Sequence, residues 1–92
     1  MSYNLSYSNK FKRALKKCYK RGLDVEKLRG VIRILVEKGS LPALYRPHRL
    51  SGKFCGAWEC HIEPDWLLVW EQNDTELTLL MIETGTHSDI FG

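Results

Sequence analysis

The stretch AWECHIEPDWLLVWEQNDTELTLLMIET, residues 57–84, contains three apolar runs separated by two short polar segments. Runs of this length, rich in branched and aromatic residues, are typical of β-strands, and we expect strands over residues 57–62, 66–72 and 76–84. Because the connections are so short, consecutive strands must be antiparallel neighbours. The stretch therefore predicts a three-stranded antiparallel meander, which decides the fold.

The residues before this stretch predict one strand and two helices. Residues 3–7, YNLSY, alternate and begin with an aromatic residue, which suits a strand. Ser8 can cap a helix that runs to about Arg21, and Asp24 can cap a second helix that ends at Gly39. The order strand, two helices, three strands predicts an α+β fold with the helices packed on one face of a small antiparallel sheet.

The bulk properties set limits on the class of protein. Ninety-two residues suffice for one small domain, and we expect residues 1–92 to form it. No apolar run approaches the roughly 20 residues that a membrane helix needs, and no signal peptide is predicted. We therefore expect a cytoplasmic protein with no membrane partner, whose three cysteines are free thiols.

The charges divide the chain into two halves. All 14 lysines and arginines lie in residues 1–53, against three acids, whereas residues 54–92 contain eight acids and no lysine or arginine. A half this basic favours a polyanionic partner such as nucleic acid, because each phosphate contact releases counterions. Solvated helix faces are the alternative. The basic residues of the first predicted helix, which we expect to contact RNA, are Lys10, Lys12, Arg13, Lys16, Lys17, Lys20 and Arg21.

A zinc site is one hypothesis for the residues around WECHIEPDW. His48, Cys55, Cys60 and His61 are all ligand types that zinc accepts, but zinc sites usually present paired ligands at close, regular spacing. Cys60 and His61 are neighbours on a predicted strand and therefore point to opposite faces. We expect no metal site and no cofactor, and we expect Cys60 to lie in the core.

Three histidines and an aspartate are placed to meet at one edge of the predicted sheet. His61 lies near the end of one strand, and Asp65 lies in the turn that follows it. His48 is in the loop before the first meander strand, and His87 follows the last one. Histidine titrates near neutrality, so one ring can accept a proton while another donates one. Each of these residues, taken singly, is equally consistent with a hydrogen-bonded surface or turn position.

The chain has no recognisable nucleophile motif and no glycine-rich phosphate loop. Acid–base groups in a basic domain suit RNA cleavage in which the substrate's own 2′-OH attacks the neighbouring phosphate. That reaction needs a base, an acid, positive charge and an aromatic surface for a splayed nucleobase. Phe91, one residue from the terminus, has little reason to be buried. Trp58, Trp66 and Trp70 suit packing better than base stacking.

The run HRLSGKFCGAWECHIEPDWLLVW, residues 48–70, followed by GTHSDIF, residues 85–91, resembles the YafQ-type toxins of the RelE/ParE superfamily. The resemblance covers the whole chain, including the basic helical hairpin, and no motif position departs from it. It implies a RelE-like fold and a ribosome-dependent endoribonuclease of a type II toxin–antitoxin system. Such a toxin enters the A site of the 70S ribosome and cuts mRNA there, without a metal.

The same resemblance implies partners and site residues. We expect a cognate antitoxin, contact with operator DNA only through the toxin–antitoxin complex, and a monomeric free toxin. The residues that correspond to the catalytic set are His48, His61, Asp65 and His87. The residues expected to contact substrate are Phe91, Trp66, Lys53 and Arg49. Trp66 has a second expected role, which is to support Asp65.

The roles within the catalytic set are assigned as hypotheses. We expect His87 to be the general acid, because a flexible terminal segment can close over the leaving 5′-oxygen. Asp65 or His61 would be the general base, and His48 would stabilise charge on the phosphate or orient its partner. Three alternatives remain: a ParE-type gyrase poison, an RNA-binding module without activity, and a decayed toxin kept as an antitoxin partner.

Overall fold

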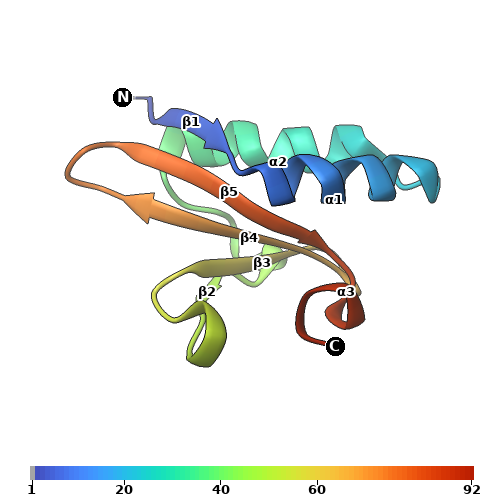
Figure 1. Ribbon diagram of the computed structural model, residues 1–92. Helices are drawn as coiled ribbons and strands as arrows, with labels where there is room; N and C mark the ends of the chain where they lie inside the picture. The colour runs from blue at the N-terminus through green and yellow to red at the C-terminus, as the bar shows by residue number, and fades with distance from the viewer. Residues whose placement is uncertain (1) are drawn as a thin grey trace.

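The computed structural model describes residues 2–92. The elements in chain order are β1 (Asn4–Tyr7), α1 (Asn9–Lys20), α2 (Val25–Lys38), the 3₁₀ turn η1 (Ala43–Tyr45), β2 (His48–Arg49), the 3₁₀ turn η2 (Gly52–Phe54), β3 (Trp58–Glu63), β4 (Trp66–Asn73), β5 (Thr78–Gly85) and α3 (His87–Phe91). The strands form one five-stranded sheet in the order β1-β5-β4-β3-β2. Helices α1 and α2 lie on one side of this sheet, and α3 lies at the end of β5 on the other side (Figure 1).

The predicted meander is confirmed. Strands β3, β4 and β5 pair antiparallel in sequence order, with Cys60 opposite Leu68 and Leu68 opposite Thr84. The sheet as a whole is mixed, because β1 pairs parallel with β5, placing Leu5 opposite Leu79. Two-residue strand β2 adds the opposite edge by pairing antiparallel with β3. The four elements missing from the sequence prediction are β2, the 3₁₀ turns η1 and η2, and α3.

Helix boundaries follow from the expected caps. The Ser8 hydroxyl accepts a hydrogen bond from the Phe11 N–H at 3.0 Å and starts α1. The Asp24 carboxylate accepts one from the Glu26 N–H at 3.1 Å and starts α2. Gly39 ends α2 in the left-handed region, at φ 69°, where a residue without Cβ is favoured. Both predicted helices are therefore confirmed to within about a residue at each end.

Strand β5 starts at Thr78 rather than at residue 76. The side-chain oxygen of Asn73 accepts hydrogen bonds from the N–H groups of Thr75 and Glu76, at 3.0 and 2.8 Å. Leu77 then takes a positive φ of 56°. Because the Asn73 side chain captures these two donors, the turn extends into the segment that the apolar pattern had placed in the strand.

The main core lies between the helices and the sheet. Helices α1 and α2 contribute residues such as Phe11 and Leu35, and the sheet contributes Cys60, Leu68 and Trp70. Cys60 is fully buried, which confirms its expected place, and burial raises the pKa of its thiol to about 12. The thiol therefore stays protonated at neutral pH and is a packing group.

A second, smaller core covers the opposite face of the sheet. Leu67 and Val69 of β4 pack there with Ala57 and with Ile90 of α3. The C-terminal residues, expected to form a flexible segment, are instead the helix α3, held against the sheet by the buried Ile90. None of the helices between residues 2 and 92 has the length and apolar character to cross a bilayer.

Candidate active site at the sheet edge

The expected catalytic residues converge from four parts of the fold. His48 is on β2, directly opposite Glu59 of β3. His61 follows Glu59 by two positions on the same strand, so both side chains leave one face of the sheet. Asp65 lies in the β3–β4 turn, and His87 is the first residue of α3. The alternation that buries Cys60 on the helix side thus presents Glu59 and His61 on the other side.

Asp65 and His87 form a tight pair. Oδ1 of Asp65 lies 2.7 Å from Nδ1 of the His87 ring and also accepts the His87 backbone N–H at 3.0 Å. Hydrogen bonds from the His87 backbone and ring lower the pKa of Asp65, so this carboxylate is ionised at neutral pH. An ionised carboxylate can only accept, so the proton between them belongs to Nδ1. Within residues 2–92, Nε2 of His87 has no hydrogen-bond partner.

His61 stands next to this pair. The ring centroids of His61 and His87 are 5.9 Å apart. Nδ1 of His61 lies 3.2 Å from the carbonyl oxygen of Pro64, which fixes that nitrogen as the donor. Nε2 of His61 is then free to accept a proton, and it lies 4.0 Å from Oε1 of Glu59.

Glu59 is a site residue that the sequence analysis missed. It is 4% exposed, and its Oε1 lies 3.3 Å from Nε2 of His48 as well as near His61. A buried carboxylate is costly unless polar partners satisfy it. The signal was present in the sequence, because Glu59 and His61 are two positions apart on a predicted strand and must share a face. Glu59 therefore joins His48 and His61 into one cluster of ionisable side chains.

The site is open to solvent. The side chains of Asp65 and His87 are 66% and 54% exposed. An enclosed pocket suits a small molecule, whereas acid–base groups on an open edge suit a large substrate that covers them on binding. Chemically, this arrangement offers a proton acceptor at Nε2 of His61 and, when the His87 ring is doubly protonated, a proton donor at Nε2 of His87, with the rings oriented by the Pro64 carbonyl and the Asp65 carboxylate.

The residues expected to contact substrate differ in how far they are exposed. Phe91 is 48% exposed on α3, and the Arg49 guanidinium lies over the ring of Trp58, 5.1 Å from its centroid. Trp66 is only 2% exposed and donates its indole N–H to the Thr84 hydroxyl at 2.9 Å. Its ring is therefore covered by protein and offers no face for a nucleobase. Of the two roles expected for Trp66, its burial is compatible with support of the neighbouring Asp65.

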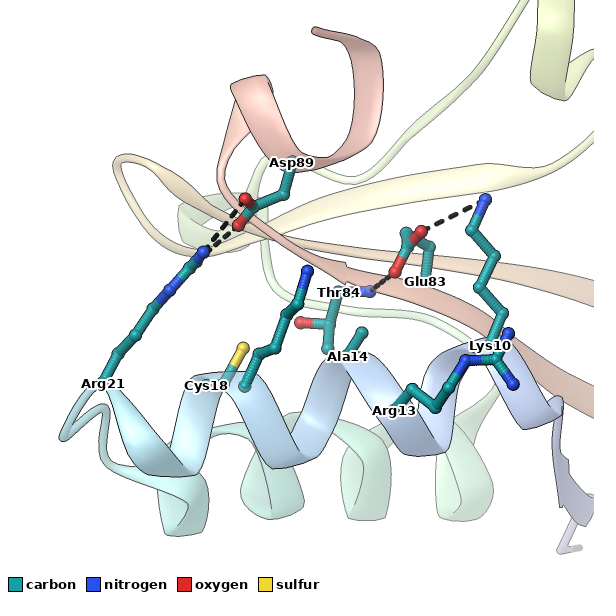
Figure 2. A pocket seen from close by; sticks show the side chains of 9 residues that line it. Lys10, Arg13, Ala14, Cys18, Arg21, Glu83, Thr84 and Asp89 are labelled. Atoms are coloured by element: carbon teal, nitrogen blue, oxygen red, sulfur yellow. Dashed lines mark hydrogen bonds and ion pairs between the residues drawn. The ribbon is translucent and has the colours of Figure 1, made fainter.

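The basic residues of α1 fall into two groups. All seven that were expected to contact RNA are exposed. Lys10 and Arg21 bind carboxylates of this chain, Glu83 at 3.3 Å and Asp89 at 2.6 Å. Both pairs border a cavity of about 440 Å³ between α1, β5 and α3 (Figure 2). The remaining five have no ion-pair partner within the described part of the chain: Lys12, Arg13, Lys16, Lys17 and Lys20.

Arg21 and Asp89 tie α3 to α1. The guanidinium contacts both carboxylate oxygens, at 2.6 and 3.2 Å (Figure 2). Asp89 also accepts the Thr86 N–H at 2.9 Å. The Thr86 hydroxyl accepts the Asp89 N–H in return, which completes a capping box. A five-residue helix is not stable alone. This pair therefore positions α3 and, with it, His87.

We expect Asp89→Asn to loosen α3 at neutral pH. The Arg21 hydrogen bonds, the first cause, lower the pKa of Asp89 well below its usual range. Because folding lowers this pKa, the stabilisation is complete above the unfolded value near 3.9 and is lost as pH falls through the folded value. The helical NMR chemical shifts of Ile90 should therefore decrease in Asp89→Asn at neutral pH, and in wild type only in strong acid.

The matched control is Glu26→Gln, which removes an exposed carboxylate paired with Arg29 on α2. It should leave the shifts of Ile90 unchanged. Wild-type shifts in Asp89→Asn at neutral pH would contradict the assignment of Asp89 as the residue that holds α3.

The sheet order and the helical pair on one face are those of a RelE-like fold. Residues 3–92 match the family model described as the bacterial toxin of type II toxin–antitoxin systems, YafQ. The chain belongs to the YafQ toxin family.

Relatives with known names support this membership. The mRNA interferase toxin YafQ of Escherichia coli strain K12 is 36% identical over 91 residues, which cover 97% of this chain and 96% of that protein. A chain in the crystal structure of the E. coli DinJ–YafQ toxin–antitoxin complex is 33% identical over the full length of both, with a TM-score of 0.90. A metal-bound toxin from Helicobacter pylori is 35% identical, with a TM-score of 0.87, over 99% of this chain and 100% of that one.

No group of three or more His, Cys, Asp or Glu side chains among residues 2–92 is arranged to hold a metal ion. In particular, His61 and Cys60 face opposite sides of the sheet, as expected for neighbours on a strand. Activity without a metal stays a prediction.

Proposed function

We propose that this chain is an mRNA interferase, a ribosome-dependent endoribonuclease that cuts mRNA in the A site of the 70S ribosome. The observation that carries the proposal is the Asp65–His87 pair beside His61, with Nε2 of both rings available to a substrate. The E. coli relative, similar along its whole length, is an mRNA interferase. The proposed site needs no metal and no cofactor.

The proposed reaction uses the substrate's 2′-OH as nucleophile. His61 takes the 2′-OH proton at Nε2, the nitrogen that lies 4.0 Å from Oε1 of Glu59, and the 2′-oxygen forms a bond to phosphorus. The bond from phosphorus to the 5′-oxygen breaks, and His87, which enters this step as an imidazolium with protons on both nitrogens, donates its Nε2 proton to that oxygen. The products are a 2′,3′-cyclic phosphate and a 5′-OH. His61 is favoured over Asp65 as base because Asp65 already accepts two hydrogen bonds from His87.

His48 takes the supporting role in this proposal. Nδ1 of His48 lies 3.0 Å from the carbonyl oxygen of Arg46, and Nε2 lies 3.3 Å from Glu59. The ring is therefore held at both nitrogens by protein acceptors, which suits orientation of Glu59 and compensation of charge better than proton transfer to substrate. Lys53 and Arg49 would add positive charge near the phosphate.

The proposed partners are the 70S ribosome, mRNA and a cognate antitoxin that neutralises the toxin. The E. coli relative is found in complex with the antitoxin DinJ. We propose that operator DNA is reached only through such a complex and that the free toxin is a monomer. The unpaired lysines and arginine of α1 would contact ribosomal RNA, because they are exposed and lack carboxylate partners among the described residues.

Reversing three of these charges should weaken ribosome binding. The variant Lys12→Glu/Lys16→Glu/Lys20→Glu is expected to lower affinity by about tenfold or more and to flatten the salt dependence by roughly 0.7–0.9 per lost phosphate contact. The matched control, Arg29→Glu/Arg33→Glu/Lys38→Glu, changes net charge equally on α2. Affinity of both variants for 70S ribosomes can be measured by co-sedimentation over a range of salt. Equal losses in the two variants would show that α1 has no special role.

The proposed function is tested by mRNA cleavage in a translation extract, mapped by primer extension. Cuts inside codons that require ribosomes and wild-type toxin are expected. Folded toxin that inhibits growth without producing such cuts would contradict the proposal and favour a gyrase poison or a non-catalytic RNA-binding protein. Folded toxin without either effect would be a decayed one.

A further inference from the structure

Phe54 lies at the centre of a cluster that the proposed catalytic set does not use. Its ring meets the ring of Phe91 edge to face, with centroids 5.8 Å apart and planes at 88°. Two ammonium groups lie over the Phe54 ring, Nζ of Lys53 at 5.3 Å and Nζ of Lys10 at 5.9 Å from its centroid. The four residues come from η2, α3 and α1, segments far apart in the sequence.

The cluster lies beside the proposed general acid. Phe91 follows His87 by four positions in α3, and residues four apart lie on one face of a helix. Phe54 packs into the smaller core with Ile90, while Phe91 remains 48% exposed. The exposed ring and the two cations are therefore next to the place where the scissile phosphate would bind.

We infer that Phe54 is a positioning residue for the single-stranded RNA substrate: it holds Phe91 and Lys53, already expected to contact that substrate, and brings Lys10 to the same nucleotide subsite. A nucleobase stacks on the exposed ring of Phe91, and the adjoining phosphate lies between the two ammonium groups. The inference rests on the proposed function, since it names where that substrate binds. It also assigns Lys10 to substrate binding, whereas the sequence analysis grouped this residue with the RNA contacts of the first helix.

The physical argument for Phe54 is that it orders three mobile groups. An edge-to-face contact fixes the Phe91 ring more closely than burial alone. Cation–π contacts within about 6 Å limit the positions that a lysine ammonium samples. Lys10 is held further by Glu83, with Nζ 3.3 Å from its carboxylate, and reaches that residue across the cavity from α1 (Figure 2). Preordered groups lose less conformational entropy when the ligand binds.

The charge of the cluster favours an anion. Lys10 is compensated by Glu83, whereas Lys53 has no carboxylate partner within residues 2–92. One uncompensated cation beside an exposed aromatic ring is the combination that proteins use for single-stranded nucleic acid, in which the base stacks and the backbone is neutralised.

The test is binding of a short, fluorescein-labelled 2′-O-methyl RNA to full-length protein at low salt, followed by fluorescence anisotropy. Phe54→Leu, which keeps an apolar side chain, is expected to bind about tenfold more weakly, and Phe54→Tyr within about twofold of wild type. An abasic version of the RNA should lose less affinity in Phe54→Leu than normal RNA does, because only the stacking on Phe91 depends on the base. Tyr19→Leu, an exposed aromatic on α1, is the matched control and should change nothing.

A second variant, Lys53→Met, tests the subsite without disturbing the packing of the core. Lys53→Met removes one exposed charge and is expected to weaken binding and lower the salt slope by about one phosphate contact. Wild-type affinity in both Phe54→Leu and Lys53→Met, equal losses on normal and abasic RNA, or no measurable binding by wild type would each overturn the inference.

This RNA lacks a free 2′-OH and the assay contains no ribosome, so the result is independent of cleavage. Phe54-dependent binding without mRNA cleavage in the extract would leave the subsite standing and remove the ribonuclease proposal. Cleavage by wild type together with Phe54-independent binding would support the ribonuclease proposal and overturn the subsite.

Discussion

His87→Gln is expected to lower the rate of mRNA cleavage on programmed ribosomes by about 10²–10⁴-fold, the usual contribution of a general acid. Glutamine keeps the backbone N–H that donates to Asp65 and can still fill the space beside it. It cannot release a proton to the 5′-oxygen. The loss should appear in the single-turnover rate at saturating toxin, with ribosome affinity unchanged.

The matched control for His87→Gln is Ser88→Ala, the next residue of α3, which has an exposed side chain. This control should cleave at the wild-type rate. The pH–rate profile supplies a second criterion, because His87→Gln should lose the limb that reports the acid. Cleavage by His87→Gln within about threefold of wild type would show that another group protonates the leaving oxygen, since removing a general acid costs far more.

Trp66→Ala is expected to lower the free energy of unfolding by about 3–5 kcal/mol, the usual cost of truncating a buried tryptophan. Trp66 is 2% exposed, and its indole N–H donates to the Thr84 hydroxyl. That hydroxyl itself donates to the Leu67 carbonyl oxygen at 2.7 Å. Removing the ring therefore opens a cavity and disturbs the pairing of β4 with β5 directly after Asp65.

Urea denaturation of Trp66→Ala and Trp58→Ala measures this difference. Trp58 is half-buried and stacks on Trp70 with centroids 6.3 Å apart, so its removal should cost clearly less. A small loss of stability in Trp66→Ala, combined with a large loss of RNA binding, would restore Trp66 as a substrate contact.

The parts of the fold that were predicted correctly are those with local signals. Ser8 and Asp24 satisfy N–H groups three and two residues ahead of them, and the meander strands are joined by turns of a few residues. The parallel pairing of β1 with β5 joins residues more than 70 positions apart, such as Leu5 and Leu79, and nothing in either segment specifies it. Helix α3 was missed because a five-residue helix carries little periodic pattern.

The candidate site also divides into a part that the sequence predicted and a part that depends on long-range contacts. Topology alone placed His61, Asp65 and His87 at one edge, and the resemblance made them a set. The contacts that orient them are long-range: Asp65 with His87 across 22 positions, and Arg21 with Asp89 across 68. Such pairs depend on the packing of α3 against the sheet and α1. Arg21, assigned to RNA from its charge, proved to bind a carboxylate of its own chain.

The chemical proposal depends on one atom of the substrate, the 2′-oxygen at the cut. After the cut is mapped, an mRNA with a single 2′-deoxynucleotide at that position can be placed in the A site of programmed ribosomes. If the 2′-OH is the nucleophile, cleavage at that bond disappears, and the normal mRNA yields a 2′,3′-cyclic phosphate end. Cleavage of the deoxy-substituted mRNA at the normal rate would contradict the mechanism and require water or a protein group as the nucleophile.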